Sequence, residues 1–206
     1  MISLFIDTSI SYPTIVIVKD DNIIYYYHEQ VDKNMSTLIL PIINEGLIKN
    51  NLSIKDVDKL FVVTGPGSFT GIRIGVAIAK TIAWALKKDV IEISSLELIA
   101  SANKDKKYAI SMIDARRNNV FAGVYDLNLN SVMEDCLINK DELYQKIDME
   151  DSVMLSYDAI ECSVKPEINI IKVISKHFND LGINPHKLKP NYLKLTEAEE
   201  NRLKND

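Results

Sequence analysis

The sequence of 206 residues has little of what marks the simplest functional classes. It contains only two cysteines, Cys136 and Cys162, which are too few for a disulfide scaffold and lie at no metal-binding spacing. Its net charge is −5, whereas wide contact with a nucleic-acid backbone needs a basic surface. Its most apolar stretch, 72–86, is interrupted by Arg73 and Lys80 and is too short to span a bilayer. We therefore expect a cytoplasmic protein that does not span a membrane.

The sequence also lacks the patterns that carry common catalytic and metal chemistry. Its three histidines, His28, His177 and His186, include no pair at the H-x-x-x-H spacing of metal ligands. No glycine-rich loop is followed by the lysine of a P-loop. The aspartates that end predicted strands have no acid or base partner nearby, so no general acid–base pair can be nominated. We predict no catalytic residue, no metal and no cofactor.

Hydrophobic periodicity divides the first hundred residues into strands and helices. Strands are predicted at 2–6, 14–18, 23–28, 60–64 and 90–93. Helices are predicted at about 35–49, 70–86 and 94–103. Pro41 should start, bend or disrupt the first helix, and Ser53 with Asp56 suggests a capped turn.

The same order restarts after the charged segment 104–107. Further strands are predicted at 108–113, 120–125, 132–138 and 153–157, with helices at 141–147 and 172–181. Each half opens with a strand that ends in an aspartate, Asp7 or Asp114. This order predicts two tandem mixed-sheet α/β subdomains, 1–104 and 105–206, the second degenerate. It is similar to the ribonuclease-H-like unit shared by actin, Hsp70 and sugar kinases.

The most informative stretch reads T-GPGSFTGIRIG at 64–75, between a β-branched strand and a helix. Gly65 and Gly67 allow positive φ at a tight turn, and Ser68 is a candidate N-cap. Loops of this type can bind anions at a helix N-terminus. The helix itself carries a stripe of small residues four apart: Gly71, Gly75, Ala79 and Ala83. Such a stripe lets another backbone approach closely, either in the chain's own sheet or in a partner subunit.

Several segments in order resemble the TsaB (YeaZ) family over nearly the whole chain. They are S-L-F-I-D-T-S at 3–9, L-I-L-P-I-I at 38–43, GPGSFTGIRIG at 65–75, S-S-L-E-L-I-A at 94–100, I-D-A-R-R at 113–117 and P-N-Y-L-K at 190–194. The chain departs from the family at 34–36, where a histidine is usual, and at Asn118, where many members have glycine. Asparagine tolerates left-handed geometry, so that turn should survive.

The resemblance implies an actin-like ATPase fold and a non-catalytic, scaffolding or activating role. Such subunits pair with a TsaD-type catalytic subunit and a TsaE-type ATPase, which together transfer threonylcarbamoyl to adenosine 37 of ANN-decoding tRNAs. We expect contact with tRNA only indirectly through the complex, and a homodimer when the partner is absent. The predicted partner interface comprises Leu38, Ile42, Arg73, Gly75, Val76, Ala79, Lys80 and Ala83.

The main alternative is an ATP-dependent small-molecule kinase with an actin-like fold. In such kinases aspartate-containing turns of both halves hold Mg²⁺ and phosphates, and Asp7 and Asp114 occupy analogous places. A candidate vestigial nucleotide site would then comprise Asp7, Thr8, Ser9, Gly65, Gly67 and Ser68. Neither turn has the glycine that lets it wrap a phosphate closely. We favour an Asx-type turn for Asp7, and an exposed or ion-paired role over a phosphate clamp for Arg116 and Arg117.

Overall fold

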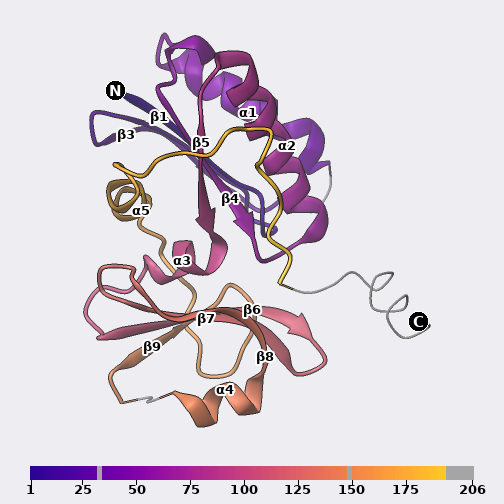
Figure 1. Cartoon of the computed structure of the whole chain (residues 1–206), viewed down its shortest axis with the longest axis vertical. Coiled ribbons are helices and arrows are strands. Elements are labelled where there is room, and N and C mark those ends of the chain that lie inside the picture. The colour runs from indigo at the N-terminus through magenta and orange to yellow at the C-terminus, as the bar shows by residue number, and fades with distance from the viewer. Residues whose placement is uncertain (32–33, 148–149, 194–206) are drawn as a thin grey trace, which may run out of the picture.

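The computed structural model describes residues 1–31, 34–147 and 150–193, and its strands form two sheets (Figure 1). The first has the order β3-β2-β1-β4-β5, built from β1 (Ile2–Asp7), β2 (Thr14–Lys19), β3 (Asn22–His28), β4 (Lys59–Gly65) and β5 (Val90–Ser94). The second has the order β8-β7-β6-β9, built from β6 (Tyr108–Arg116), β7 (Asn119–Asp126), β8 (Ser131–Asn139) and β9 (Ser152–Leu155). In each sheet an antiparallel meander is extended by a parallel strand, β4 or β9. The repeated order confirms the predicted tandem mixed-sheet units.

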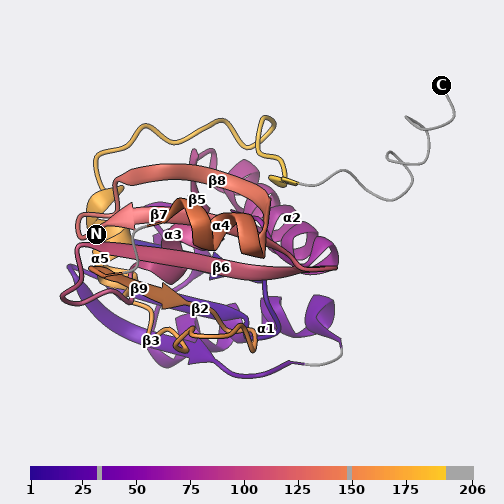
Figure 2. The same ribbon diagram turned by 90° about the horizontal axis from the view of Figure 1, so that it is seen from below.

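Helices cover these sheets in layers (Figures 1 and 2). One face of the first sheet carries α1 (Met35–Lys49) and α2 (Phe69–Leu86). Between the two sheets lies α3 (Ser95–Ala100), with α5 (Ile170–Lys176) packed beside it. The outer face of the second sheet carries α4 (Lys140–Lys146). A short 3₁₀ turn, Ile54–Asp56, has the capping box predicted from Ser53 and Asp56.

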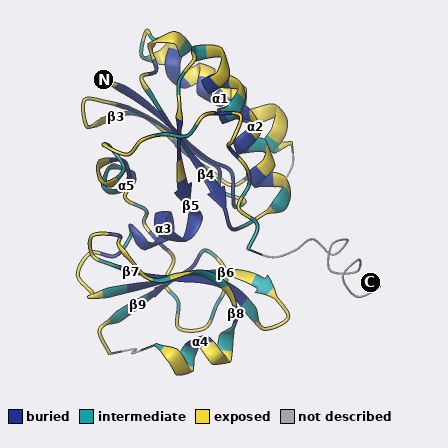
Figure 3. Cartoon of the chain, in the orientation of Figure 1, coloured by how far each residue is buried: buried dark blue, intermediate teal, exposed yellow. Residues whose placement is uncertain are grey.

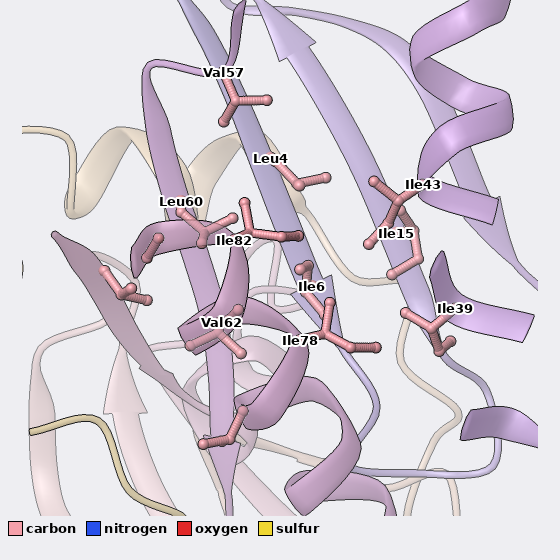
Figure 4. Close-up of a cluster of buried hydrophobic side chains, with 14 of the residues drawn as sticks. Leu4, Ile6, Ile15, Ile39, Ile43, Val57, Leu60, Val62, Ile78 and Ile82 are labelled. Atoms are coloured by element: carbon pink, nitrogen blue, oxygen red, sulfur yellow. The ribbon is translucent and has the colours of Figure 1, made fainter. Parts of the chain in front are cut away.

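The central strand β1 is buried on both faces. Leu4 and Ile6 pack in the core beneath α1 and α2 (Figure 4), whereas Phe5 packs in a second core between the two sheets. Successive side chains of a strand point to opposite faces, so a strand covered on both sides is apolar at nearly every position. A third, smaller core lies under α4 around Leu143.

Two predicted helices have different limits in the structure. The helix predicted to end at Asn103 ends at Ala100, and the one predicted at 172–181 covers only 170–176. The Asn169 side chain caps the start of α5 by accepting a hydrogen bond from Lys172 N at 3.0 Å. The apolar pattern had extended the prediction to Leu181, which is 96% exposed.

Pro41 does not interrupt α1, which is continuous over its 15 residues. Pro41 lies on the exposed side of the helix. Proline has no backbone N–H, so one carbonyl of the preceding turn lacks its helical donor. On the exposed side of the helix water can reach that carbonyl, so the helix tolerates the lost hydrogen bond.

The chain returns to the first sheet after α5. Ile183 forms an antiparallel bridge with Val90 at the edge of that sheet, and Leu188 is buried in the core beneath α1 and α2. We call residues 183–193 the C-terminal strap. The predicted boundary at 104/105 thus separates the two sheets, but the strap belongs in sequence to the second subdomain and packs on the first.

By length and composition alone, α2 is apolar enough to cross a membrane, a test that core helices also pass. Eight of its residues are buried in the chain's own core. Its setting in this structure is that of a core helix packed on a sheet.

Candidate functional site

The D-T-S loop after β1 and the glycine-containing loop before α2 lie against each other. Ser68 N donates a hydrogen bond to Ser9 O at 2.7 Å, and Thr8 Oγ1 donates to Gly71 O at 2.7 Å. Both Thr8 and Ser9 are almost fully buried. The structure therefore brings most residues of the candidate nucleotide site together, namely Asp7, Thr8, Ser9, Gly67 and Ser68.

The glycines of the second loop allow segments of the chain to approach closely. Gly67 has a φ of +152°, and a Cβ there would lie 2.4 Å from Ser9 O. Gly65 has a φ of +121°, and a Cβ there would lie 2.6 Å from Asn191 O of the strap. Ser68 caps α2 as predicted, since its Oγ accepts from Gly71 N at 3.2 Å. Two donors that a phosphate would need, Ser68 N and Gly71 N, are thus used within the chain.

Asp7 forms the Asx-type turn that we favoured over a phosphate ligand. It is 2% exposed, and its Oδ1 accepts from Ser9 N at 2.7 Å. Burial raises the pKa of Asp7 from 3.8 to about 6, although the hydrogen bond from Ser9 N opposes that shift. Nearby, burial and then the charge of Asp7 raise the pKa of Tyr157, and among the described residues neither Tyr157 Oη nor Ser9 Oγ has a hydrogen-bond partner.

The strap packs on the start of α2. Asn191 N donates to Thr64 O at 2.8 Å, and the Tyr192 ring stacks on Phe69 with 4.7 Å between centroids. Arg73 Nε donates to Tyr192 Oη at 2.7 Å. The P-N-Y segment and the GPGSF segment, far apart in the sequence, therefore form one packed unit.

Five of the eight predicted interface residues are buried inside the chain. They are Ile42, Gly75, Val76, Ala79 and Ala83. The reason is the small-residue stripe, which faces the chain's own D-T-S loop: a Cβ at Gly75 would lie 2.4 Å from Thr8 Oγ1. The prediction must be corrected here, because the close approach that the stripe allows is made by β1 and its loop. A charged replacement of Gly75 or Ala79 would therefore destabilise the fold itself, and its effect on partner binding could not be read separately.

Leu38, Arg73 and Lys80 remain at or near the surface. Arg73 contacts the strap as described, and Lys80 Nζ donates to His186 O at 3.3 Å. These two cations therefore hold the strap along α2.

Exposed residues lie along the outer faces of α1 and α2 (Figure 3), and of the apolar ones among them sequence reasoning had included only Leu38 in the interface. We call this set the docking surface, defined by Leu38, Pro41, Ile48, Ala77, Trp84 and Ala85. Trp84, the only tryptophan of the chain, is 64% exposed. A signal was present, because Arg73, Ala77, Lys80 and Trp84 fall on one face of a helix, and two cations mark that face as the outer one.

The turn that opens the second sheet is exposed. Asp114, Arg116, Arg117 and Asn118 all lie at the surface. Within residues 1–31, 34–147 and 150–193, neither Arg116 nor Arg117 forms an ion pair, so of the two roles left open for them the structure favours the exposed one. Asn118 has a φ of 60°, so the left-handed turn is retained without glycine, as predicted.

Two of the three histidine rings, those of His28 and His177, take part in hydrogen bonds. His28 Nδ1 lies 2.9 Å from Thr14 Oγ1, and His177 Nε2 lies 2.7 Å from Glu97 Oε1. In the part of the chain that the structure describes, no three His, Cys, Asp or Glu side chains are grouped as a metal site would require.

Known proteins resemble this chain in sequence. The family model for tRNA N6-adenosine threonylcarbamoyltransferase (TsaD) matches residues 26–189. The chain is 38% identical over 135 residues to the tRNA threonylcarbamoyladenosine biosynthesis protein TsaB of Bacillus subtilis, which covers 65% of this chain and 58% of that protein. It is 30% identical over 154 residues to the TsaB protein of Buchnera aphidicola subsp. Acyrthosiphon pisum, covering 71% of this chain and 69% of the relative. The match thus spans less than two thirds of the Bacillus protein.

A solved structure resembles it in fold. YeaZ from Pseudomonas aeruginosa superposes with a TM-score of 0.80 at 19% identity, over 93% of this chain and 99% of that one. The fold is therefore the actin-like ATPase, ribonuclease-H-like fold, with a reduced second unit.

Proposed function

Because this chain belongs to the family that the TsaD model describes, and within it to the TsaB (YeaZ) proteins, we propose that it serves threonylcarbamoyladenosine formation on tRNA. Its role is that of a non-catalytic subunit that binds and activates a TsaD-type catalytic subunit. That subunit, with a TsaE-type ATPase, transfers threonylcarbamoyl to adenosine 37 of ANN-decoding tRNAs. The proposed setting is the cytoplasm.

The observation that carries the proposal is the docking surface. Ile48 and Trp84 are each 64% exposed on helices whose opposite faces are buried. Large apolar side chains gathered on one face of a protein mark an interaction site, and tryptophan is among the residues enriched at the energetic centre of interfaces. We propose that these outer faces bind the catalytic subunit, and a second copy of this chain when that subunit is absent.

A non-catalytic role is supported by how the D-T-S loop is built. Asp7 is held in a turn by Ser9 N, and the amide of Ser68 is bonded to Ser9 O. These contacts close the loops on each other, which weighs against the alternative of an ATP-dependent kinase. An ATP-turnover assay on the isolated chain distinguishes the two functions, because the proposed subunit hydrolyses no ATP by itself.

The test of docking uses the double variant Ile48→Glu/Trp84→Glu. Both side chains are exposed, so the variant should keep the wild-type circular dichroism spectrum and melting temperature. It should no longer co-elute with the TsaD-type subunit, and a reconstituted complex should lose threonylcarbamoyladenosine formation. Val132→Glu is the matched control, because Val132 is 56% exposed on β8, away from both helices.

Co-elution of the double variant at wild-type affinity would place the interface elsewhere. The function itself is tested by omission: the TsaD-type subunit, the TsaE-type ATPase, tRNA and threonylcarbamoyl adenylate are combined with and without this chain. Equal yields of modified tRNA in both reactions would disprove the proposed function.

A further inference from the structure

The turn between β6 and β7 has a backbone that its residues do not favour. Arg116 pairs with Asn119 across the hairpin, so Arg117 and Asn118 form a two-residue turn. The φ angles of Arg116, Arg117 and Asn118 are 66°, 53° and 60°. Non-glycine residues avoid positive φ, and arginine gains nothing there from a short polar side chain. We call residues 114–118 the arginine tip.

The β2–β3 hairpin of the same chain also has positive φ at its turn, but aspartates occupy those positions. The β2–β3 turn is Asp20–Asp21, with φ angles of 47° and 64°. Asn34 and Asn51 also adopt positive φ, at 63° and 55°, and so do Lys87, Leu129 and Cys162, each of them singly. Asparagine and aspartate are the residues that such turns prefer. Two adjacent arginines in left-handed geometry therefore point to a use of their side chains rather than to the needs of the turn.

Aspartates around the arginine tip hold its backbone in place. Asp114 Oδ1 accepts from Arg116 N at 3.0 Å, and Asp158 Oδ2 accepts from Asp114 N at 2.7 Å. Asp141 Oδ2 accepts from the Asn118 side chain at 2.7 Å. These carboxylates fix the shape of the loop instead of pairing with the guanidinium groups.

The two guanidinium groups are consequently available. Arg116 and Arg117 are exposed, and with the described residues neither side chain forms a hydrogen bond, ion pair or ring contact. By contrast, Arg73 Nε donates a hydrogen bond to Tyr192 Oη, and the Arg73 guanidinium lies over the Tyr192 ring. The chain has 20 lysines but only four arginines, and two of those four are adjacent here. Arginine differs from lysine in a planar fork that binds phosphate through two parallel hydrogen bonds.

We propose that the arginine tip binds a phosphodiester group of the RNA that the assembled complex modifies, an inference that rests on the proposed function. An acidic protein surface is the less favoured ligand, because the arginines that dominate protein–protein interfaces usually have a surround that excludes water. The tip offers none, since residues 114 and 116–118 and the neighbouring Asp141 and Glu142 are polar and exposed. Phosphate contacts are polar and hydrated, which matches this surface.

Two further features indicate how many phosphates the tip would hold and on which side of the molecule it would hold them. With a net charge of −5 the chain has no wide basic footprint, so the tip is expected to hold one or two phosphates while a partner subunit binds most of the RNA. The β6–β7 end lies on the side of the molecule that carries α1 and α2 (Figures 1 and 2). The tip therefore faces the same side of the molecule as a partner bound on the docking surface would occupy.

The experiment compares the wild-type complex with complexes that contain Arg116→Asn/Arg117→Asn or Arg116→Lys/Arg117→Lys. Asparagine accepts positive φ, so the first variant removes both charges while relieving the turn and should melt no lower than wild type. Co-elution reports assembly, and tRNA binding is measured at several salt concentrations.

The asparagine variant should assemble normally but bind tRNA about tenfold more weakly at ~0.1 M salt, and its slope of log K against log salt should be shallower by about 1–2. The lysine variant should keep most of the slope and lose a few-fold in affinity, because it retains charge without the fork. Unchanged affinity and slope for the asparagine variant would overturn the proposal. So would loss of assembly, which would assign the tip to a protein contact. Failure of the proposed function gives a different result, namely equal modification of tRNA with and without the wild-type chain.

Discussion

The hairpins that open the two sheets share one local device in two opposite environments. Asp7 Oδ1 accepts from Ser9 N at 2.7 Å, and Asp114 Oδ1 accepts from Arg116 N at 3.0 Å, so each aspartate binds the amide two residues later. Asp7 is 2% exposed, whereas Asp114 lies at the surface. Only the first loop is covered by a long helix, α2, whose glycines contact Thr8.

The difference shows that the same turn can lie either in a core or at a surface. Under α2 the turn becomes part of the core and pins a helix to a sheet. Among the described residues, the outer face of the second sheet carries only the seven-residue helix α4. The turn of the second unit therefore stays accessible. Burial made the first loop part of the core, and exposure left the second accessible to solvent.

The largest expected loss of stability comes from disrupting the contact between α2 and the D-T-S loop. Gly75→Glu should lower the free energy of unfolding by about 4 kcal/mol, because it forces a side chain against Thr8 and buries a charge without a partner. Urea unfolding followed by circular dichroism measures it. Thr70→Glu, at an exposed position in the first turn of the same helix, is the control and should be neutral or slightly stabilising. A soluble Gly75→Glu protein with wild-type stability would show that the glycine stripe does not face the core.

The second prediction compares Asp7 and Asp114 by how the stability of their variants depends on pH. The pKa of Asp7 is raised from 3.8 to about 6, so stability is highest below the lower value and falls as pH rises toward the higher one. Asp7→Asn keeps the oxygen that accepts from Ser9 N and removes the ionisation. The free energy of unfolding of Asp7→Asn should therefore exceed that of the wild type by about 1 kcal/mol near pH ~4.5 and by about 3 kcal/mol near pH ~7.5.

Asp114→Asn is the matched variant for that test. Because Asp114 is exposed, its replacement should change stability by less than about 0.5 kcal/mol at either pH. Equal behaviour of the two variants would contradict the contrast between the loops.

A third effect concerns Glu97, on the helix between the sheets. It is 6% exposed and accepts from Lys176 Nζ at 2.8 Å and His177 Nε2 at 2.7 Å. Burial alone would raise the pKa of Glu97, but these hydrogen bonds outweigh it and the pKa is lowered. Burial alone would lower the pKa of His177, but the bonds to Glu97 and Asp180 raise it. Glu97→Gln should cost about 2 kcal/mol.

The pH profile identifies this pair. The stability contributed by Glu97 is present above its ordinary pKa of 4.5 and is lost as pH falls through the lowered value. That contributed by His177 is present below its ordinary pKa of 6.5 and is lost as pH rises through the raised value. Wild-type stability from the pair is thus greatest between these two ordinary values, and Glu97→Gln should flatten both limbs. A profile with both limbs intact in Glu97→Gln would exclude this pairing.

The smallest effect lies in the turns themselves. Arg117→Asn should raise the free energy of unfolding by about 0.5–1 kcal/mol, because asparagine tolerates the positive φ that arginine resists. Asp21→Arg in the β2–β3 turn, at a φ of 64°, should lower it by a similar amount. Chemical denaturation of both variants checks the sign, and a destabilised Arg117→Asn would show that the arginine supports the fold.

Local features of the candidate site could be predicted from the sequence because they depend on neighbouring residues. The Asx turn at Asp7, the cap formed by Ser68 and the left-handed Asn118 each follow from side-chain chemistry within a few positions. The inner face of α2 could not be predicted in the same way. Its apolar residues lie around nearly the whole circumference, so periodicity could not decide whether Gly75 would meet its own sheet or a partner.

The sequence by itself determined the family, the order of strands and helices and the turn chemistry, because these are written in local patterns and motifs. Only the tertiary structure decided that Gly75 and Ala79 are core, that Trp84 is exposed, and that Tyr192 packs on Arg73 across 119 positions of sequence. Such choices depend on which surfaces the folded sheet leaves uncovered. No single segment contains that information, since burial is a property of the whole packed chain.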